Sequence, residues 1–178
     1  MNIQFYIEKL HDSKEFKKFI KENPKAFTCS GFFVIDKEED EKKRDNKFHF
    51  DYYIPNKKKM FSFKLEKKVE MVPVEKFDNK KPEKISIKLD FDLEKLEEII
   101  LKRMEKEGIK NKIQKIIFSL QKLKEKDFLV GTTFITGLGM LRINLDLKTM
   151  KITLFEKKSF FDLMNIKRNK KPKKEKKN

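Results

Sequence analysis

The sequence predicts an α+β fold in which a mostly antiparallel sheet of about seven strands carries amphipathic helices on one face. The first observation is that nearly every candidate strand alternates apolar and polar residues, whereas the strands of a buried parallel sheet are apolar throughout. The second is that the candidate helices repeat apolar residues at intervals of three and four, which gives each helix one apolar stripe. The last strands, at residues 128–155, also fit a single three-stranded meander.

A first helix is predicted to begin at Asp12-Ser13-Lys14-Glu15, where a capping residue precedes a glutamate that can reach back to it. Asn23-Pro24 ends this helix, because the residue before a proline avoids the helical region. Alternation then predicts four strands, with an irregular stretch containing Pro73 and Pro82 before the last of them. These strands are expected at residues 26–36, 48–54, 61–65 and 85–91.

Two amphipathic helices are predicted to follow. One starts at a cap, Asp90 or Asp92, and ends at Gly108, a residue that favours a helix C-terminus. The other is expected at residues 113–123, where isoleucine and leucine recur at helical spacing. A last helix is expected after the capping residue Ser159. No internal repeat is visible in the sequence.

The meander at residues 128–155 has a predicted register, set by two-residue turns at Gly137-Leu138 and Lys148-Thr149. Both turns place apolar side chains on one face, whereas a slip of one residue would bring charged side chains to that face. Lys148-Thr149 lacks the residues that favour a two-residue hairpin turn, so a longer second loop is an alternative. The predicted pairs are Phe134–Leu141, Thr132–Ile143, Val130–Leu145, Phe128–Leu147, Leu147–Met150, Leu145–Ile152, Ile143–Leu154 and Asp146–Lys151.

The chain has 178 residues and a formal net charge of +16. This length fits one folded domain, placed at residues 1–166, followed by a tail at residues 167–178. The tail is almost wholly charged and is expected to be disordered, because it cannot bury enough surface to offset chain entropy. Part of the charge is compositional, since a bias toward Lys, Ile, Asn and Phe is typical of an AT-rich genome.

Cys29 is the only cysteine, which excludes an intramolecular disulfide and a cysteine metal cluster. It lies with Gly31 in an apolar strand, where a buried thiol and close packing are the structural interpretation. The N-terminus lacks the apolar core of a signal peptide, and no apolar run approaches the roughly 18 residues of a membrane span. We therefore expect a cytoplasmic protein without a membrane partner, and we predict no metal and no cofactor.

His49, Asp51 and Tyr53 form the one local cluster of residue types used in catalysis. They share a strand face that the alternation rule predicts to be a solvated surface, and a reactive site would need a third group. Gly137-Leu138-Gly139 is followed by a strand rather than a helix, so a hairpin turn is preferred to a phosphate-binding loop. No catalytic residue is predicted.

Of the features in this sequence, the basic tail is the one that most directly indicates a function. Lys and Arg neutralise phosphates and release counterions, so a flexible basic arm can bind RNA or the ribosome. A solubilising tail without a partner is the alternative. The expected nucleic-acid-binding residues are Lys167, Arg168, Lys170, Lys171, Lys173, Lys174, Lys176 and Lys177.

Residues 23–33, Asn-Pro-Lys-Ala-Phe-Thr-Cys-Ser-Gly-Phe-Phe, and residues 158–164, Lys-Ser-Phe-Phe-Asp-Leu-Met, resemble an uncharacterised group of small proteins from DPANN archaea. The resemblance covers the two ends of the domain and includes no catalytic motif. It implies the cytoplasm of an archaeon with a small genome, and it implies no activity.

The leading hypothesis is a non-enzymatic binding or adaptor protein whose basic tail contacts an acidic partner such as RNA or the ribosome. The alternative is a small-molecule binding protein with an apolar cavity between the sheet and the helices. An exposed apolar patch on the uncovered sheet face would indicate a protein partner. An enzyme ranks third, because two histidines and one cysteine leave few acids, bases or nucleophiles to choose from.

Overall fold

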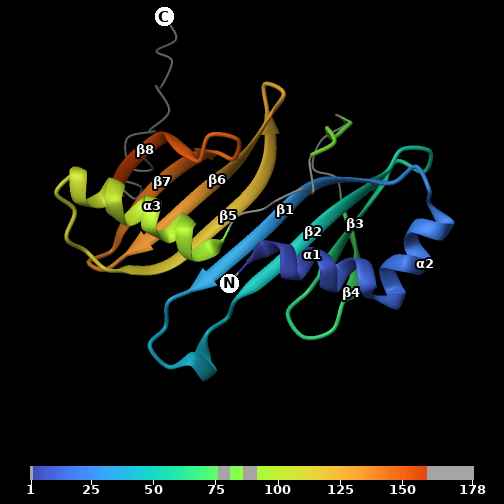
Figure 1. Cartoon of the computed structure of the whole chain (residues 1–178), viewed down its shortest axis with the longest axis horizontal. Helices are drawn as coiled ribbons and strands as arrows, with labels where there is room; N and C mark the ends of the chain where they lie inside the picture. Colours follow the sequence, from blue (N-terminus) through green and yellow to red (C-terminus); the bar gives the residue numbers. More distant parts are fainter. Residues whose placement is uncertain (1, 76–80, 86–91, 160–178) are drawn as a thin grey trace, which may run out of the picture.

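The computed structural model describes residues 2–75, 81–85 and 92–159. Within them, one antiparallel sheet of eight strands is accompanied by three α-helices (Figure 1). The predicted α+β class is confirmed, but the sheet has eight strands rather than about seven. The elements are α1 (Ile3–Asp12), α2 (Lys14–Glu22), β1 (Phe27–Asp36), the 3-10 helix η1 (Glu41–Lys43), β2 (Lys47–Ile54), β3 (Lys59–Lys64), β4 (Glu70–Val74), α3 (Leu93–Lys106), β5 (Ile113–Leu123), β6 (Lys126–Ile135), β7 (Gly139–Asp146) and β8 (Lys151–Ser159).

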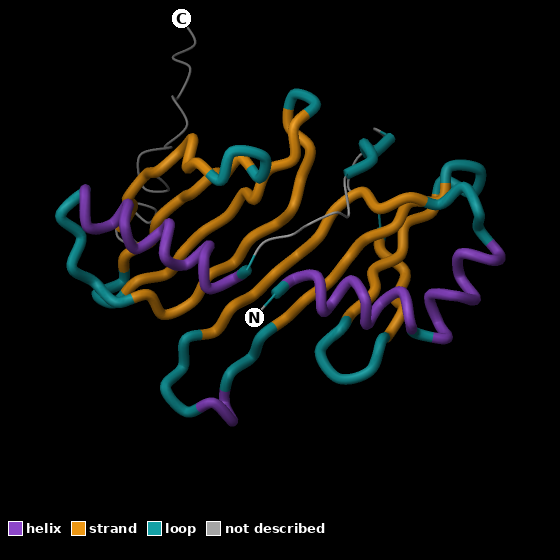
Figure 2. Tube along the Cα trace, in the orientation of Figure 1, coloured by secondary structure: helices purple, strands orange, loops and turns teal. Residues whose placement is uncertain are grey.

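The chain is arranged as two units of the same plan, although its sequence shows no repeat. Each unit is a helical segment followed by a meander of four strands, and the spatial order is β4-β3-β2-β1-β5-β6-β7-β8. Figure 2 shows the two units side by side, joined where β1 and β5 pair. Asn2 caps α1, Asp92 caps α3, and these two residues form an isolated antiparallel bridge. The helices of both units therefore start from the same point beside the central strands.

The predicted first helix is present as α2, and a second helix precedes it. The hydroxyl of Ser13 accepts a hydrogen bond from the backbone N–H of Phe16 at 3.1 Å, so Ser13 is the cap of α2. The segment before it forms α1, whose buried residues recur at intervals of four and three. Those residues are Ile3, Ile7 and Leu10.

The core lies between the helices and one face of the sheet. The ring of Tyr6 on α1 stacks on Phe48 with centroids 3.8 Å apart, and Phe16 and Phe19 on α2 lie edge-on to Phe63 at 5.3 and 5.1 Å. In the other unit the guanidinium of Arg103 on α3 lies 5.2 Å from the ring centroid of Phe155. Cross-strand pairs link these two contacts across one sheet face: Phe48–Phe33, Phe33–Phe118, Phe118–Gly131, Gly131–Ile143 and Ile143–Phe155.

Residues 113–123 form strand β5, so the helix predicted there is wrong. Ile116, Phe118 and Leu120 alternate toward the core, and the strand pairs with β1 on one side and β6 on the other. Ile117 also points away from the core, which makes both strand faces partly apolar and imitates helical spacing. Pairing on two sides satisfies the backbone, and isoleucine and phenylalanine fit a pleated surface, so tertiary contacts decided against the helix.

The register predicted for β6 and β7 is wrong by one residue. Phe134 pairs with Met140, and Leu141 pairs with Thr133. The connecting turn holds three residues, because Ile135 pairs directly with Gly139. This slip brings no charge to the core, because β6 is apolar on both faces and Phe134 simply occupies the opposite one.

The second hairpin of the meander follows the prediction only near its turn. The pairs Leu145–Ile152 and Asp146–Lys151 are confirmed. A bulge then shifts the register, so that Ile143 faces Phe155 instead of Leu154. The loop at residues 147–150 is longer than two residues, and the Asp146 side chain accepts a hydrogen bond from the Thr149 N–H at 3.0 Å.

Several predicted elements fall at the limits of the described chain. The irregular stretch contains strand β4, whose Pro73 is tolerated because an edge strand does not need every donor. Of the strand predicted at 85–91 only Ile85 is described; it is buried and donates its N–H to the Thr28 carbonyl at 3.0 Å. Ser159 is the last residue of β8. The helix predicted after it and the tail at residues 167–178 lie outside the described residues.

Burial of Tyr52 in this core predicts a loss of stability in alkali. Burial raises the pKa of Tyr52 to about 12, above the 10.0 of an exposed tyrosine. The neutral phenol is favoured in the folded chain, so its contribution is complete below pH 10 and is lost as the pH rises toward 12, at about 1.4 kcal/mol per pH unit. Urea unfolding of the protein and of Tyr52→Phe should therefore give free energies that diverge in this pH window. Parallel curves would contradict the assignment.

Candidate functional site

The sheet face that points away from the helices, called the outer face here, carries many apolar side chains. The described helices do not cover it, and its residues are absent from the cluster that forms the core. Val34 is buried among its neighbours, and the others are half-buried. In the half of the sheet around β1, β5, β6 and β7, the apolar residues of the outer face include Phe32, Val34, Ile117, Phe128, Val130, Phe134 and Met140.

The predicted cluster of His49 and Asp51 lies on this face in the other half of the sheet. The His49 Nε2 is 2.7 Å from the Glu66 carboxylate, with the two side chains 18% and 28% exposed. The hydroxyl of Ser30 donates to the carboxylate of Asp51. Because Ser30 is bonded to Asp51 and not to His49, the arrangement lacks the nucleophile–base contact of hydrolases.

Sequence reasoning missed Ser30 and Glu66 as partners of this cluster. Ser30 stands opposite Asp51 in the register of β1 and β2, and Glu66 follows β3 and reaches back to β2. Only strand pairing brings these residues together, so no spacing in the sequence could have identified them. Tyr53, the third predicted member, is buried.

Cys29 and Gly31 have the structural surroundings that the sequence predicted. Cys29 is 7% exposed, and its sulfur lies 3.4 Å from the Asp51 carbonyl oxygen and 3.7 Å from the Met60 sulfur. It occupies a bulge in the pairing of β1 with β2. A side chain at Gly31 would meet Phe33 at 3.0 Å, which confirms close packing there. Gly137-Leu138-Gly139 lies at a hairpin turn, as predicted, with positive φ at Gly137 and Leu138.

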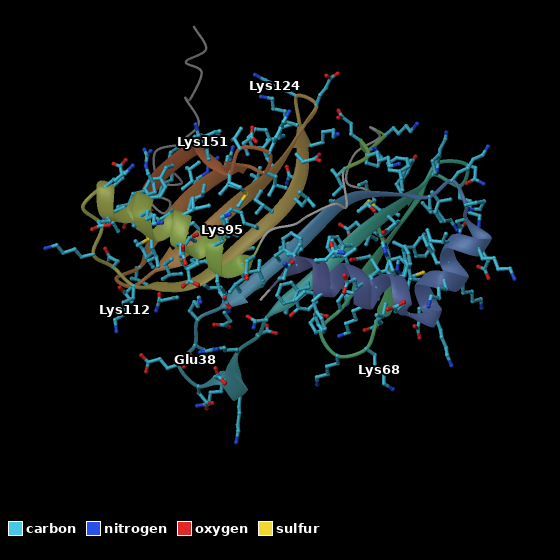
Figure 3. The ribbon with its side chains drawn as sticks, in the orientation of Figure 1. Glu38, Lys68, Lys95, Lys112, Lys124 and Lys151 are labelled. Carbon is cyan, nitrogen blue, oxygen red and sulfur yellow. The ribbon has the colours of Figure 1, made fainter. Side chains whose placement is uncertain are left out.

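A cleft of about 610 Å³ opens on the outer face where β1 ends and β5 begins, and we call it the β1–β5 cleft. Ile113, Ile117 and Phe134 supply its apolar surface. Its rim carries exposed charges from two different loops, and Figure 3 shows Glu38 and Lys112 at the same end of the molecule. The charged rim residues without an ion pair in the described chain are Glu38, Glu39 and Lys112.

Hydrogen bonds hold both walls of the β1–β5 cleft in place. The Thr136 N–H donates to the Lys112 carbonyl at 2.9 Å, and the Lys112 N–H donates to the Thr136 hydroxyl at 3.1 Å. The Asn111 side-chain amide donates to the Thr136 carbonyl at 2.8 Å. On the opposite wall Asp36 accepts from the Lys115 ammonium at 3.0 Å. Burial opposes ionisation of Asp36, but bonds from Lys115 and from the backbone of Glu38 and Asp45 outweigh it and lower its pKa. The walls are therefore fixed before any ligand arrives.

Three cations of the outer face have acidic partners. Arg142 lies 3.2 Å from Glu156, which Lys158 also approaches at 3.9 Å, and Lys115 is bonded to Asp36. A phosphate chain would have to displace these carboxylates to reach the ammonium and guanidinium groups. These three cations are therefore less available to a phosphate chain than unpaired cations would be.

A second concavity lies on the helix side of the sheet, between α2 and strands β3 and β4, and we call it the α2 groove. Its volume is about 540 Å³. Lys57, at its rim, donates to the side chain of Asn23 at 2.8 Å. Its apolar lining residues are Phe19, Ile54, Phe61, Val69 and Met71.

The described residues hold no cluster of three or more His, Cys, Asp or Glu side chains that could bind a metal ion. None of the helices that the structure describes is long and apolar enough to cross a membrane. The predicted nucleic-acid-binding residues, Lys167 through Lys177, belong to the part of the chain that the structure does not describe.

Comparison with known proteins gives similarity of fold alone. No protein-family model and no curated protein matches the chain. A crystal structure of a "putative lipoprotein" from Clostridium difficile 630 is similar, with a TM-score of 0.53 and 15% sequence identity, covering 81% of this chain and 90% of that chain. Similarity at this identity concerns the fold and carries no function across.

Proposed function

We propose that this is a non-enzymatic binding protein that holds a protein partner on the outer face, with the basic tail at residues 167–178 adding attraction to acidic groups of that partner. The observation that carries the proposal is the row of half-buried apolar side chains on a face that the described helices leave open. Exposed apolar patches rimmed by polar residues are typical of interaction sites.

The composition of the outer face supports a protein rather than a nucleic acid. Aromatic side chains, methionine and arginine are enriched in protein interfaces, and the face presents Phe32, Phe134, Met140 and Arg142. The paired cations described above offer little to a phosphate backbone. Electrostatic attraction then falls to the tail, which carries eight basic residues and one acidic residue.

The test is capture of the partner by the full-length chain and by variants altered on each sheet face. Phe134→Ser and Phe32→Ser should each weaken the recovered protein complex by roughly tenfold, because each removes apolar area from the interface. Leu101→Ser is the matched control, since Leu101 is 45% exposed and lies on α3. Neutralising the tail lysines should reduce the dependence of binding on salt.

The outcome of this experiment also separates the tail hypothesis from the face hypothesis. If RNA is recovered with the full-length chain and lost when the tail is removed, while both face variants bind normally, a polyanion partner replaces the protein partner. If the Leu101 variant loses the partner as much as the face variants do, the outer face is not the binding site.

A second candidate function is small-molecule binding in the α2 groove. Its volume lies within the roughly 300–1,000 Å³ of ligand pockets, and its apolar walls with a lysine rim resemble such sites. This position, between a helix and the sheet, is where the sequence predicted an apolar cavity. A small molecule retained on the natively purified chain in mass spectrometry, and lost in Phe61→Ser, would favour it.

A further inference from the structure

A pocket of about 480 Å³ opens on the outer face beside the turn that joins β5 to β6, and we call it the turn pocket. Figure 3 places Lys124, one of its lining residues, at the end of the molecule opposite Glu38 and Lys112 of the β1–β5 cleft. Its volume falls within the roughly 300–1,000 Å³ of small-molecule sites. The lining residues are Leu123, Lys124, Lys126, Phe128, Asn144 and Thr153.

A bulge in β8 forms one wall of the turn pocket. The register of β7 and β8 skips Thr153, and the Thr153 hydroxyl donates to the Asn144 carbonyl at 3.3 Å. Bulges bend a strand and redirect side chains, and they are common next to binding sites. Here the side-chain amide of Asn144 lies on the pocket wall and has no hydrogen-bond partner among the described residues.

The turn on the other side of the pocket has an unusual sequence for its backbone. Leu123 pairs directly with Lys126, and the two residues between them, Lys124 and Glu125, have positive φ values of 50° and 64°. A two-residue turn of this kind favours Asn-Gly, because side chains with a Cβ rarely adopt that conformation. Strained backbone positions of this type concentrate at binding and active sites. A lysine therefore stands at the pocket where local conformation alone favours asparagine or glycine.

Lysines outnumber acidic residues around the turn pocket. The two hairpin ends, at residues 122–127 and 146–151, together carry five lysines and three acidic residues. One of the acidic residues, Asp127, lies 3.5 Å from Lys122. The surroundings of the pocket are therefore positively charged and favour an anionic ligand.

Lys124 is the ammonium most available to an anion. It has no ion pair in the part of the chain that the structure describes. Lys126 acts on Asp146, whose pKa is lowered mainly by a hydrogen bond from the Thr149 N–H and also by the Lys126 charge. Lys126 is therefore shared with that carboxylate, whereas Lys124 can bind an anion without displacing an acidic partner.

We propose that the turn pocket binds a nucleotide, with the base against Phe128 and the phosphate at Lys124. Phe128 is a half-buried ring on the pocket wall, and every base has a face that can stack on an aromatic ring. The Asn144 amide offers a donor and an acceptor to the edge of a base. An acyl chain would leave this amide unpaired, and a carboxylate side chain would leave the ring uncovered. The site goes beyond the proposed function, which concerns a protein partner.

The test is titration of the full-length chain with adenosine 5′-monophosphate (AMP), followed by leucine methyl NMR. The Leu123 methyl resonances should shift, because Leu123 lines the pocket. Leu101 is the internal reference, since it is 45% exposed and lies on α3. AMP should bind about tenfold more tightly than adenosine or inorganic phosphate, because it uses both the ring and the ammonium.

Three variants separate the pocket from the fold. Lys124→Asn removes the ammonium but suits the positive φ, so it should keep the turn and weaken AMP binding about tenfold. Glu125→Gly is the matched control, because it suits the same turn and should not weaken binding. Phe128→Leu keeps an apolar side chain and should weaken binding about tenfold through the lost stacking.

Unchanged AMP affinity in Lys124→Asn and Phe128→Leu would overturn the proposal and assign the phosphate to the basic tail, which both variants retain. Inorganic phosphate that binds as tightly as AMP would also overturn it. A single-stranded oligoadenylate identifies the source of the nucleotide: tighter binding than AMP that is lost in Phe128→Leu indicates a strand, and equal binding indicates a free nucleotide. Phe134→Ser should weaken the protein complex and leave AMP binding unchanged, so each proposal can fail alone.

Discussion

Replacement of Gly131 by alanine is expected to lower the free energy of unfolding by about 3 kcal/mol or more. A Cβ at this position would stand 1.9 Å from the carbonyl oxygen of Ile117 and 2.9 Å from the Cα of Phe118, both on β5. These are backbone atoms of a strand paired on both sides, so they cannot withdraw without breaking the ladder with β1. Urea unfolding monitored by circular dichroism measures the loss.

Gly108→Ala is the control for the Gly131 experiment. Gly108 has φ +67 and no atom within 4 Å of its hypothetical Cβ. Its substitution should cost only the roughly 1–2 kcal/mol of a left-handed alanine at a helix end. If Gly131→Ala is no more destabilising than Gly108→Ala, the close approach of β5 and β6 is incorrect.

Replacement of Phe63 by alanine is expected to cost about 3 to 5 kcal/mol. The side chain is fully buried, and its ring centroid lies 5.3 Å from Phe16, 5.1 Å from Phe19 and 5.6 Å from Tyr52. Its loss leaves a cavity between α2 and the sheet and removes three edge-to-face contacts. Calorimetry and urea unfolding should both report the change.

Phe5→Ala provides the matched comparison for Phe63. Phe5 is 61% exposed on α1 and should change stability by less than about 0.5 kcal/mol. A comparable loss for both variants would contradict the position of the aromatic cluster in the core. The α2 groove lies next to Phe19, so Phe63→Ala should also disturb any ligand bound there.

The candidate site shows the limit of reasoning from sequence more sharply than the fold does. His49 and Asp51 were identified because they alternate on one strand, and the structure keeps both half-buried on the outer face. Glu66 and Ser30 could not be assigned to them, since cross-strand neighbours depend on register and not on spacing. The β1–β5 cleft was not predicted either, because its lining comes from three strands and three loops or turns that only the folded sheet brings together.

The sequence by itself determined the α+β class, the antiparallel sheet, helix starts at residues 12–15 and 90–92 and the strands at residues 26–36 and 48–54. These features follow from local chemistry: capping oxygens, strict alternation and turn residues act over a few positions of the chain. Where local signals favoured two conformations equally, contacts in the tertiary structure determined which one formed. Residues 113–123 form a strand because pairing with β1 and β6 satisfies their backbone hydrogen bonds. In β6, the three-residue turn pairs Ile135 with Gly139, and this register determines which side chains of β6 face the core. An apolar residue on both sides of a strand gives register no preference, so neighbouring strands make the choice.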